Sequence, residues 1–224
     1  MVLISEETRI PALRWVRPPQ QARSQQTLDR ILDAAEALVS EKGFDDTPVA
    51  EIARRAGSSV GSFYSRFPDK DALLGALNER FLAQAVVTAD VALDPARWQR
   101  ATIDEIAAAV VRFLVEIHRE QRGLLRAFAQ RMRVDPEFHA RRERLSQHIA
   151  TGLSALLLAH RAEIRHDDAP RAAGFALTMV FGVLEHTILF GELRSGVLAW
   201  TDDDLSTELA RAFLAYLTVP SRPA

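Results

Sequence analysis

The sequence contains no cysteine, and this absence excludes several kinds of site. Without thiols the chain has no disulfide framework and no thiolate metal site, which suits a reducing compartment. Aromatic residues make up only 7% of the 224 residues. Neither sign of charge dominates, since 28 basic residues stand against 30 acidic ones. The resulting net charge of −2 argues weakly against a nucleic-acid partner.

The chain also lacks a long uninterrupted hydrophobic run. Glu6, Glu7 and Arg9 interrupt the N-terminal segment, which therefore has no secretory pattern. The most hydrophobic stretch, Ala172–Leu184, ends before it reaches the length of a bilayer span, because Glu185 follows it. We therefore expect a soluble, cytoplasmic protein with no membrane partner. The histidines are too scattered to indicate a metal site, and no cofactor is expected.

A helical pattern begins near residue 23 and dominates the rest of the chain. Residues 1–22 carry the Pro18-Pro19 pair and no sustained helical period, so we expect a flexible arm there. Beyond the arm, apolar residues recur every three or four positions and strand signals are scarce. The pattern predicts an all-α protein with a compact head at residues 23–85 and a larger helical body at residues 86–219.

Glycine and hydroxyl residues divide the head into short helices. Gly43 is expected to end the first helix, since glycine accepts the left-handed geometry of a helix end. Thr47 is expected to cap the second helix with its hydroxyl, and Gly57 to end it. Two short helices joined by a glycine-containing turn form a helix-turn-helix unit, here at about residues 47–66.

The third helix of the head is short and rich in small residues. Ser58 or Ser59 is expected to start it. Phe63 and Phe67 are expected in the core rather than at a contact surface, because short helices need aromatic contacts to hold them. Asp69 is then expected to cap a long fourth helix that runs to about Thr88.

The stretch from Phe44 to Leu74, FDDTPVAEIARRAGSSVGSFYSRFPDKDALL, resembles the DNA-binding head of the tetracycline-repressor (TetR) family. The resemblance covers roughly residues 23–85 and is specific because many elements occur in order at the family's spacings. The matching elements are Gly43-Phe44, Thr47, Ile52-Ala53, Ala56-Gly57, Ser59, Gly61, Phe63-Tyr64, Phe67-Pro68, Lys70 and Leu73-Leu74. The resemblance implies a three-helix, helix-turn-helix DNA-binding head on a larger body that binds ligand and dimerises.

By this resemblance the chain is a sequence-specific transcriptional regulator, most simply a repressor that a small-molecule effector releases from its operator. The implied DNA contacts are Thr47, Tyr64 and Lys70 with phosphates, and Ser58, Ser59, Val60, Gly61 and Ser62 with bases. Small serine and glycine side chains let a helix lie deep in the major groove. Many family members have lysine where this chain has Val60, so the operator sequence stays open.

The resemblance also implies a homodimer and an effector pocket in the body. Pairing would use the last two long helices, at about residues 171–192 and 203–217, and a two-fold dimer would require a near-palindromic operator. The final helix would contribute Leu205, Leu209, Phe213 and Leu217. The pocket candidates are His118, Arg126, Glu185 and His186. The alternative for these four is that they pair with one another, or with water, at an interface.

Two other functions remain possible at this point. An all-α enzyme is one, although no nucleophile elbow, phosphate loop or metal-binding histidine pair appears. An adaptor whose head no longer binds DNA is the other, and the intact Tyr64 and Lys70 argue against it. Activation instead of repression, the identity of the effector and the role of residues 1–22 also stay open.

Overall fold

A computed structural model of the chain describes residues 22–191, 194–195 and 198–219. These residues divide into two compact units whose boundary lies between Ala85 and Val86. We call the unit up to residue 85 the head and the unit from residue 86 the body. Nearly all of the predicted arm, residues 1–21, lies outside the described residues.

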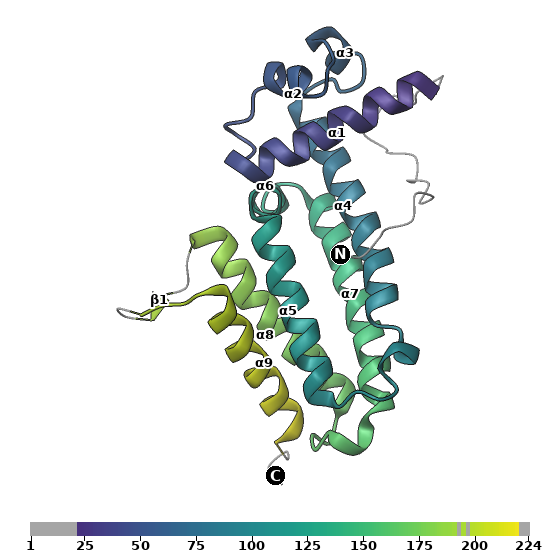
Figure 1. Cartoon of the computed structure of the whole chain (residues 1–224), viewed down its shortest axis with the longest axis vertical. Coiled ribbons are helices and arrows are strands. Elements are labelled where there is room, and N and C mark those ends of the chain that lie inside the picture. Colours follow the sequence, from purple (N-terminus) through teal and green to yellow (C-terminus); the bar gives the residue numbers. More distant parts are fainter. Residues whose placement is uncertain (1–21, 192–193, 196–197, 220–224) are drawn as a thin grey trace. The chain divides into compact units, whose positions relative to one another are not determined.

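The head consists of helices whose apolar faces meet in one core. Its elements are α1 (Ala22–Lys42), α2 (Val49–Arg55), α3 (Val60–Tyr64) and the first part of α4 (Lys70–Ala92) (Figure 1). The apolar residues of α1 recur at three- and four-residue intervals and therefore share one buried face. The core contains Leu28, Ile31, Leu32, Ala35, Leu38, Val39, Ile52, Phe63, Phe67, Leu73 and Leu77.

Two glycines end helices of the head in the geometry that the sequence predicted. The φ angles of Gly43 and Gly57 are 88° and 61°, in the left-handed region that side chains with a Cβ avoid. The N–H of Gly43 donates to the carbonyl of Val39 at 2.8 Å and closes α1. The predicted ends of the first two helices are confirmed.

Thr47 does not cap α2, so that prediction is wrong. Pro48 occupies the N-cap position, and no side chain caps the helix. The hydroxyl of Thr47 instead donates to the carbonyl of Gly43 at 2.7 Å. That carbonyl stands at the end of α1 and has no partner within its own helix. The hydroxyl therefore satisfies a carbonyl at the end of the preceding helix rather than an N–H at the start of the following one.

The caps of α3 and α4 agree with the sequence analysis. Of the two serines considered, Ser59 is the N-cap of α3, and its Oγ accepts the N–H of Ser62 at 3.0 Å. Asp69 precedes α4 and accepts the N–H of Ala72 at 2.7 Å. Each cap satisfies a backbone donor that the first turn of a helix leaves free.

The body is a bundle of helices with polar residues at their N-caps. Its helices are α5 (Ile103–Glu120), α6 (Arg122–Met132), α7 (Pro136–Ala159), α8 (Ala169–Phe190) and α9 (Asp202–Thr218), with short 3-10 turns at Pro95–Trp98 and Arg161–Glu163. α5 runs along α9, and α8 lies beside both α7 and α9 (Figure 1). Thr102, Asp135, Asp168 and Thr201 cap α5, α7, α8 and α9.

α8 is the most apolar element of the body. With 22 residues, α8 is long and apolar enough by length and composition to cross a bilayer. This corrects the expectation that the hydrophobic stretch is too short. One side of the helix is buried against α7 and α9 and contributes eight residues to the core of the body. This packing is typical of a core helix.

The segment between α8 and α9 contains a small hairpin that the sequence analysis did not predict. β1 (Arg194–Ser195) pairs antiparallel with β2 (Leu198–Ala199), with Arg194 opposite Ala199. Strands of two residues are too short to produce a detectable period-two pattern. The predicted all-α class is confirmed, since about 81% of the described part of the chain is helical.

Candidate functional site

α3 has a buried aromatic side and an exposed side of mixed character. Phe63 is 0% exposed and contacts Phe67 with ring centroids 5.2 Å apart, which confirms both as core residues. On the other side Val60 is 41% and Tyr64 49% exposed, and Gly61 is exposed between them. The Tyr64 ring stands edge-on to Phe63 at 5.3 Å. The aromatic core thus fixes the orientation of a surface that stays accessible.

Nothing in the structure of the head requires a glycine at position 61. A Cβ built there would meet only the Oγ of Ser59, at an ordinary 3.8 Å, and the φ of Gly61 is not positive. A glycine inside a helix costs roughly 0.5–1 kcal/mol relative to alanine. The missing side chain therefore points to an outside surface that approaches this backbone closely.

The hydroxyls of α3 are linked to the arginine that follows the helix. Nη1 of Arg66 donates to the carbonyl oxygen and to the Oγ of Ser62, both at 2.9 Å. The Oγ of Ser65 donates to the same carbonyl at 2.8 Å. Ser58 and Ser62 are half-buried, whereas Ser59 is exposed. The serines therefore lie in defined positions at the edge of the exposed surface.

Lys70 joins the loop after α1 to the start of α4. Its Nζ donates to the carbonyls of Phe44 and Asp45 and lies 4.3 Å from the centroid of the Phe44 ring. Burial lowers the pKa of Lys70, while nearby carboxylates, that of Asp45 first, act in the opposite direction. An ammonium group has three donors. The two carbonyls take two of them, and no third hydrogen-bond acceptor lies within reach among the described residues.

Thr47 lies inside the head, away from this surface. The residue is 0% exposed, and its hydroxyl hydrogen is donated to Gly43. The geometry gives no support to the expected phosphate contact. Among neighbouring cations, Arg55 pairs with Glu41 at 2.8 Å, whereas Arg54 is exposed and forms no ion pair within the described part of the chain.

Two of the four predicted effector residues come together in the body. Glu185 on α8 lies 3.4 Å from Arg142 on α7, and the ring of His118 on α5 lies 6.1 Å from that of Phe181 on α8. Burial lowers the pKa of His118, and the positive charge of Arg142 adds to the effect. The neutral ring donates through Nδ1 to the Leu114 carbonyl at 2.7 Å, so Nε2 remains an acceptor.

Two residues near His118 and Glu185, Arg142 and Phe181, were not among the predicted effector residues. No local signal marks them, because each lies more than 20 residues from His118 along the chain and joins it only through helix packing. We call His118, Arg142, Phe181 and Glu185 the body cluster. It presents a cation, an anion, a neutral acceptor and an aromatic face from three helices.

The other two predicted effector residues make contacts of a different kind. Arg126 is exposed and donates to the carbonyl of Leu189 at 3.1 Å, and Arg122 donates to that of Thr187 at 3.0 Å. Both arginines of α6 thus satisfy carbonyls at the C-terminal end of α8, where cations are favourable. His186 is exposed and lies against the Phe190 ring, with centroids 5.0 Å apart.

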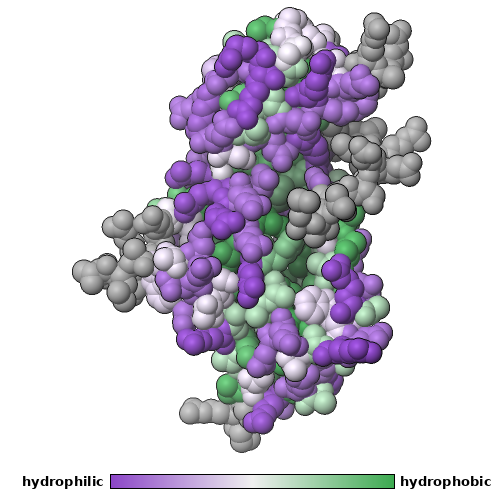
Figure 2. Space-filling model, in the orientation of Figure 1, coloured by the Kyte–Doolittle hydropathy of each residue, from purple (hydrophilic) through white to green (hydrophobic). Residues whose placement is uncertain are grey.

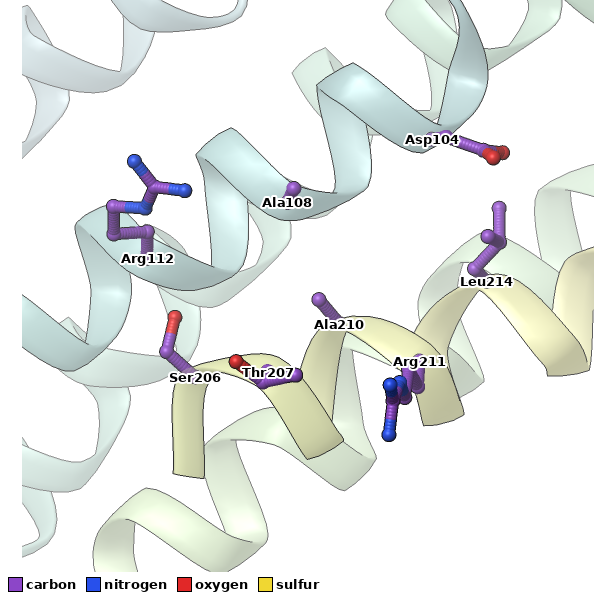
Figure 3. A pocket seen from close by; sticks show the side chains of 8 residues that line it. All are labelled: Asp104, Ala108, Arg112, Ser206, Thr207, Ala210, Arg211 and Leu214. Carbon is purple, nitrogen blue, oxygen red and sulfur yellow. The ribbon is translucent and has the colours of Figure 1, made fainter. Parts of the chain in front are cut away.

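A pocket of about 250 Å³ lies between α5 and α9. Asp104, Ala108 and Arg112 of α5 line it together with Ser206, Thr207, Ala210, Arg211 and Leu214 of α9 (Figure 3). The hydroxyl of Ser206 and the methyl group of Ala210 point from α9 toward α5 (Figure 3). None of the predicted effector residues lines this pocket.

The predicted dimer contacts of the last helix are wrong in detail. Leu205, Leu209, Phe213 and Leu217 are buried within the chain's own core. The exposed apolar residues of this region are instead Phe175 and Phe190 on α8 and Val219 after α9. Phe175 contacts Tyr216 of α9, with centroids 4.9 Å apart. On the face seen in Figure 2, hydrophobic surface reaches the outside of the body among hydrophilic side chains.

Comparisons with known proteins agree with this arrangement along most of the chain. A model described as bacterial regulatory proteins of the tetR family matches residues 31–77, and one described as a tetracyclin repressor-like C-terminal domain matches residues 102–217. The HTH-type transcriptional regulator Rv2250c of Mycobacterium tuberculosis is 30% identical over 192 residues, which cover 84% of this chain and 93% of that protein.

Solved structures share the fold. A TetR-family regulator from Mesorhizobium loti matches with a TM-score of 0.66 at 22% identity, over 88% of this chain and 98% of that one. RolR, crystallised in complex with its ligand resorcinol, matches with a TM-score of 0.55 at 24% identity, over 90% of this chain and 96% of that one.

Proposed function

Because the chain belongs to the tetR family of bacterial regulatory proteins, we propose that it is a homodimeric repressor that a small effector releases from a near-palindromic operator. Family membership makes it a DNA-binding transcriptional regulator. The observation that supports the proposal most directly is the surface of α3, where Val60, Gly61 and Tyr64 are exposed over the buried Phe63.

The proposed DNA contacts follow this surface. α3 enters the major groove, where the missing side chain of Gly61 allows the backbone to approach the base edges. The base contacts we propose are Ser58, Ser59, Val60, Gly61 and Ser62. Tyr64 donates its phenol to a phosphate, and Lys70 offers its remaining N–H to another. Thr47 is not included, because its hydroxyl is buried.

The proposed dimer places a second copy on the outer faces of α8 and α9. Phe175 and Phe190 expose apolar surface there, and exposed apolar patches mark interaction sites. Gly182 is exposed, and a Cβ built on it would meet nothing within 4 Å, so the chain itself gives no reason for a glycine there. Two-fold pairing would bring two recognition helices to successive major grooves and require a near-palindromic site.

The proposed effector site is the body cluster. A half-buried arginine and glutamate beside an aromatic ring suit a small molecule with a hydrophobic body and a few polar groups. The complex of RolR with resorcinol, an aromatic diol, supports a body of this fold as a ligand holder. Arg126 and His186 are not included, because Arg126 satisfies a carbonyl of α8 and His186 lies on an exposed face.

Release from DNA requires that the effector bind two states of the dimer unequally. A ligand with equal affinity for both shifts nothing. We propose that α4, which contributes to both the head and the body, transmits the difference. We also propose that the protein acts in the cytoplasm and has no catalytic activity.

Selection of duplexes from a randomised pool tests the proposal. We expect a near-palindromic site and a protein that sediments as a dimer. Tyr64→Phe, which keeps the contact with Phe63, should weaken binding to every sequence by about three- to tenfold. Thr151→Val, which removes an exposed hydroxyl from α7 in the body, is the control and should leave DNA affinity unchanged. A monomer that binds no duplex at low ionic strength would contradict the proposal.

A small-molecule screen tests the effector site separately. A compound that raises the melting temperature of the wild type but not of Arg142→Met identifies a ligand of the body cluster. We expect that compound to weaken operator binding at least tenfold. Unchanged operator affinity at saturation would exclude effector-controlled release by that ligand.

A further inference from the structure

Two hydroxyls of α3 are already engaged as hydrogen-bond acceptors. Ser59 Oγ accepts the N–H of Ser62 at 3.0 Å, and Ser62 Oγ accepts from Nη1 of Arg66 at 2.9 Å. A serine hydroxyl has one donor and two acceptor lone pairs. In both serines a lone pair is in use, while the O–H has no acceptor within the described part of the chain. Each hydroxyl therefore keeps its O–H but only one lone pair, which makes it more available to an outside partner as a donor than as an acceptor.

Arg66 determines this polarity at Ser62. A guanidinium group carries only donors and stays charged, so it can present nothing but an N–H to the serine. Its Nη1 also donates to the Ser62 carbonyl at 2.9 Å, which holds the arginine over the end of α3. A cationic donor on one lone pair strengthens the O–H as a donor and weakens the remaining lone pair as an acceptor.

We propose that Arg66 and the N-cap hold Ser62 and Ser59 as hydrogen-bond donors toward the major groove, so that α3 selects acceptor atoms of the bases. Those atoms are purine N7, guanine O6 and thymine O4, whereas adenine N6 and cytosine N4 are donors. The inference rests on the proposed DNA-binding surface of α3. It makes Arg66 a positioning residue, which determines specificity through Ser62 without touching the DNA.

The test uses the operator selected by the wild-type protein and single-atom changes in its bases. A 7-deazapurine removes the N7 acceptor. Replacing thymine by 4-thiothymine keeps the methyl group and exchanges the O4 acceptor for a weaker sulfur acceptor. At one position per half-site we expect such a change to weaken wild-type binding about tenfold. The same change should weaken binding of Ser62→Ala less than about twofold.

Two variants separate polarity from simple packing. Arg66→Leu frees both lone pairs of Ser62, and the tenfold sensitivity should fall to about threefold or less at the same position. Arg66→Lys, which restores a cationic donor, should recover most of it. Arg54→Leu is the matched control, because exposed Arg54 forms no hydrogen bond with either serine within the described residues, and the sensitivity should stay unchanged.

The outcomes distinguish this inference from the proposed function. If no duplex is selected, the proposed function fails. If an operator is selected, purine in place of adenine tests sensitivity to a lost amino group. If Ser62→Ala removes that sensitivity, the serine acts as an acceptor and this inference is wrong. Absence of any position coupled to Ser62 overturns it as well. Should Arg66→Leu unfold the head, the comparison of the wild type with Ser62→Ala still decides whether Ser62 donates to a base.

Discussion

The head and the body differ in how far apart along the chain the members of each site lie. In the head, Thr47 reaches Gly43 and Arg66 reaches Ser62, each four residues away. In the body, Arg142 reaches Glu185 across 43 residues. Local chemistry therefore builds most of the proposed DNA-binding surface, whereas the body cluster exists only once long helices have packed. Substitutions in the two regions should behave differently for that reason.

The largest effect is expected from Phe63→Ala. Removing a fully buried ring from the contact with Phe67 should destabilise the head by about 3–5 kcal/mol. Hydrogen exchange measured peptide by peptide should show lost protection in α1 to α3 and retained protection in α5 to α9. DNA binding should disappear. Equal loss of protection in both regions would mean that the chain unfolds as one unit and would break the comparison.

Gly57→Ala and Gly61→Ala form a matched pair in neighbouring positions. Gly57 has a positive φ, so alanine there should cost about 1–2 kcal/mol of folding stability. Gly61 has space for a methyl group, so alanine there should leave stability unchanged or slightly raised. Its methyl group should still weaken operator binding about tenfold, because it would face the groove. Normal DNA affinity of the folded Gly61→Ala protein would argue against close approach of α3.

Thr47→Val tests whether position 47 is structural. Loss of the hydrogen bond to Gly43 should destabilise the head by about 1 kcal/mol in urea unfolding. The salt dependence of DNA binding should not change, since a buried hydroxyl makes no phosphate contact. A reduced salt slope together with unchanged stability would restore the phosphate contact that the sequence suggested.

The smallest effect concerns the pH dependence of the body. Burial holds the pKa of His118 below its ordinary 6.5, so the unfolded chain binds this proton more readily. The stability that neutral His118 contributes is present above about pH 6.5 and is lost as the pH falls toward the folded-state pKa. His118→Asn should therefore lose less stability than the wild type between about pH 7.5 and 5. Parallel stability curves would contradict this.

Several parts of the site were predictable from sequence because they depend on neighbours along the chain. Gly43 and Gly57 end helices through backbone freedom, and Ser59 caps α3 through a hydrogen bond three residues away. Phe63 was assigned to the core from the needs of a short helix. Thr47 was misassigned because a hydroxyl between two helices can satisfy either one. Only the structure of the loop between α1 and α2 shows that the Thr47 hydroxyl donates to the carbonyl of Gly43.

By itself the sequence determined the helical class and the order of the helices, and its resemblance to the family indicated where to propose the DNA-binding surface. Caps, glycines and apolar periodicity act within one or two turns of a helix, so a short stretch of sequence is enough to reveal them. Tertiary packing alone decided that Arg142 joins Glu185 and that the apolar residues of α9 face inward rather than toward a partner. Periodicity reveals that a helix has an apolar face, but which neighbour covers that face depends on how whole helices pack.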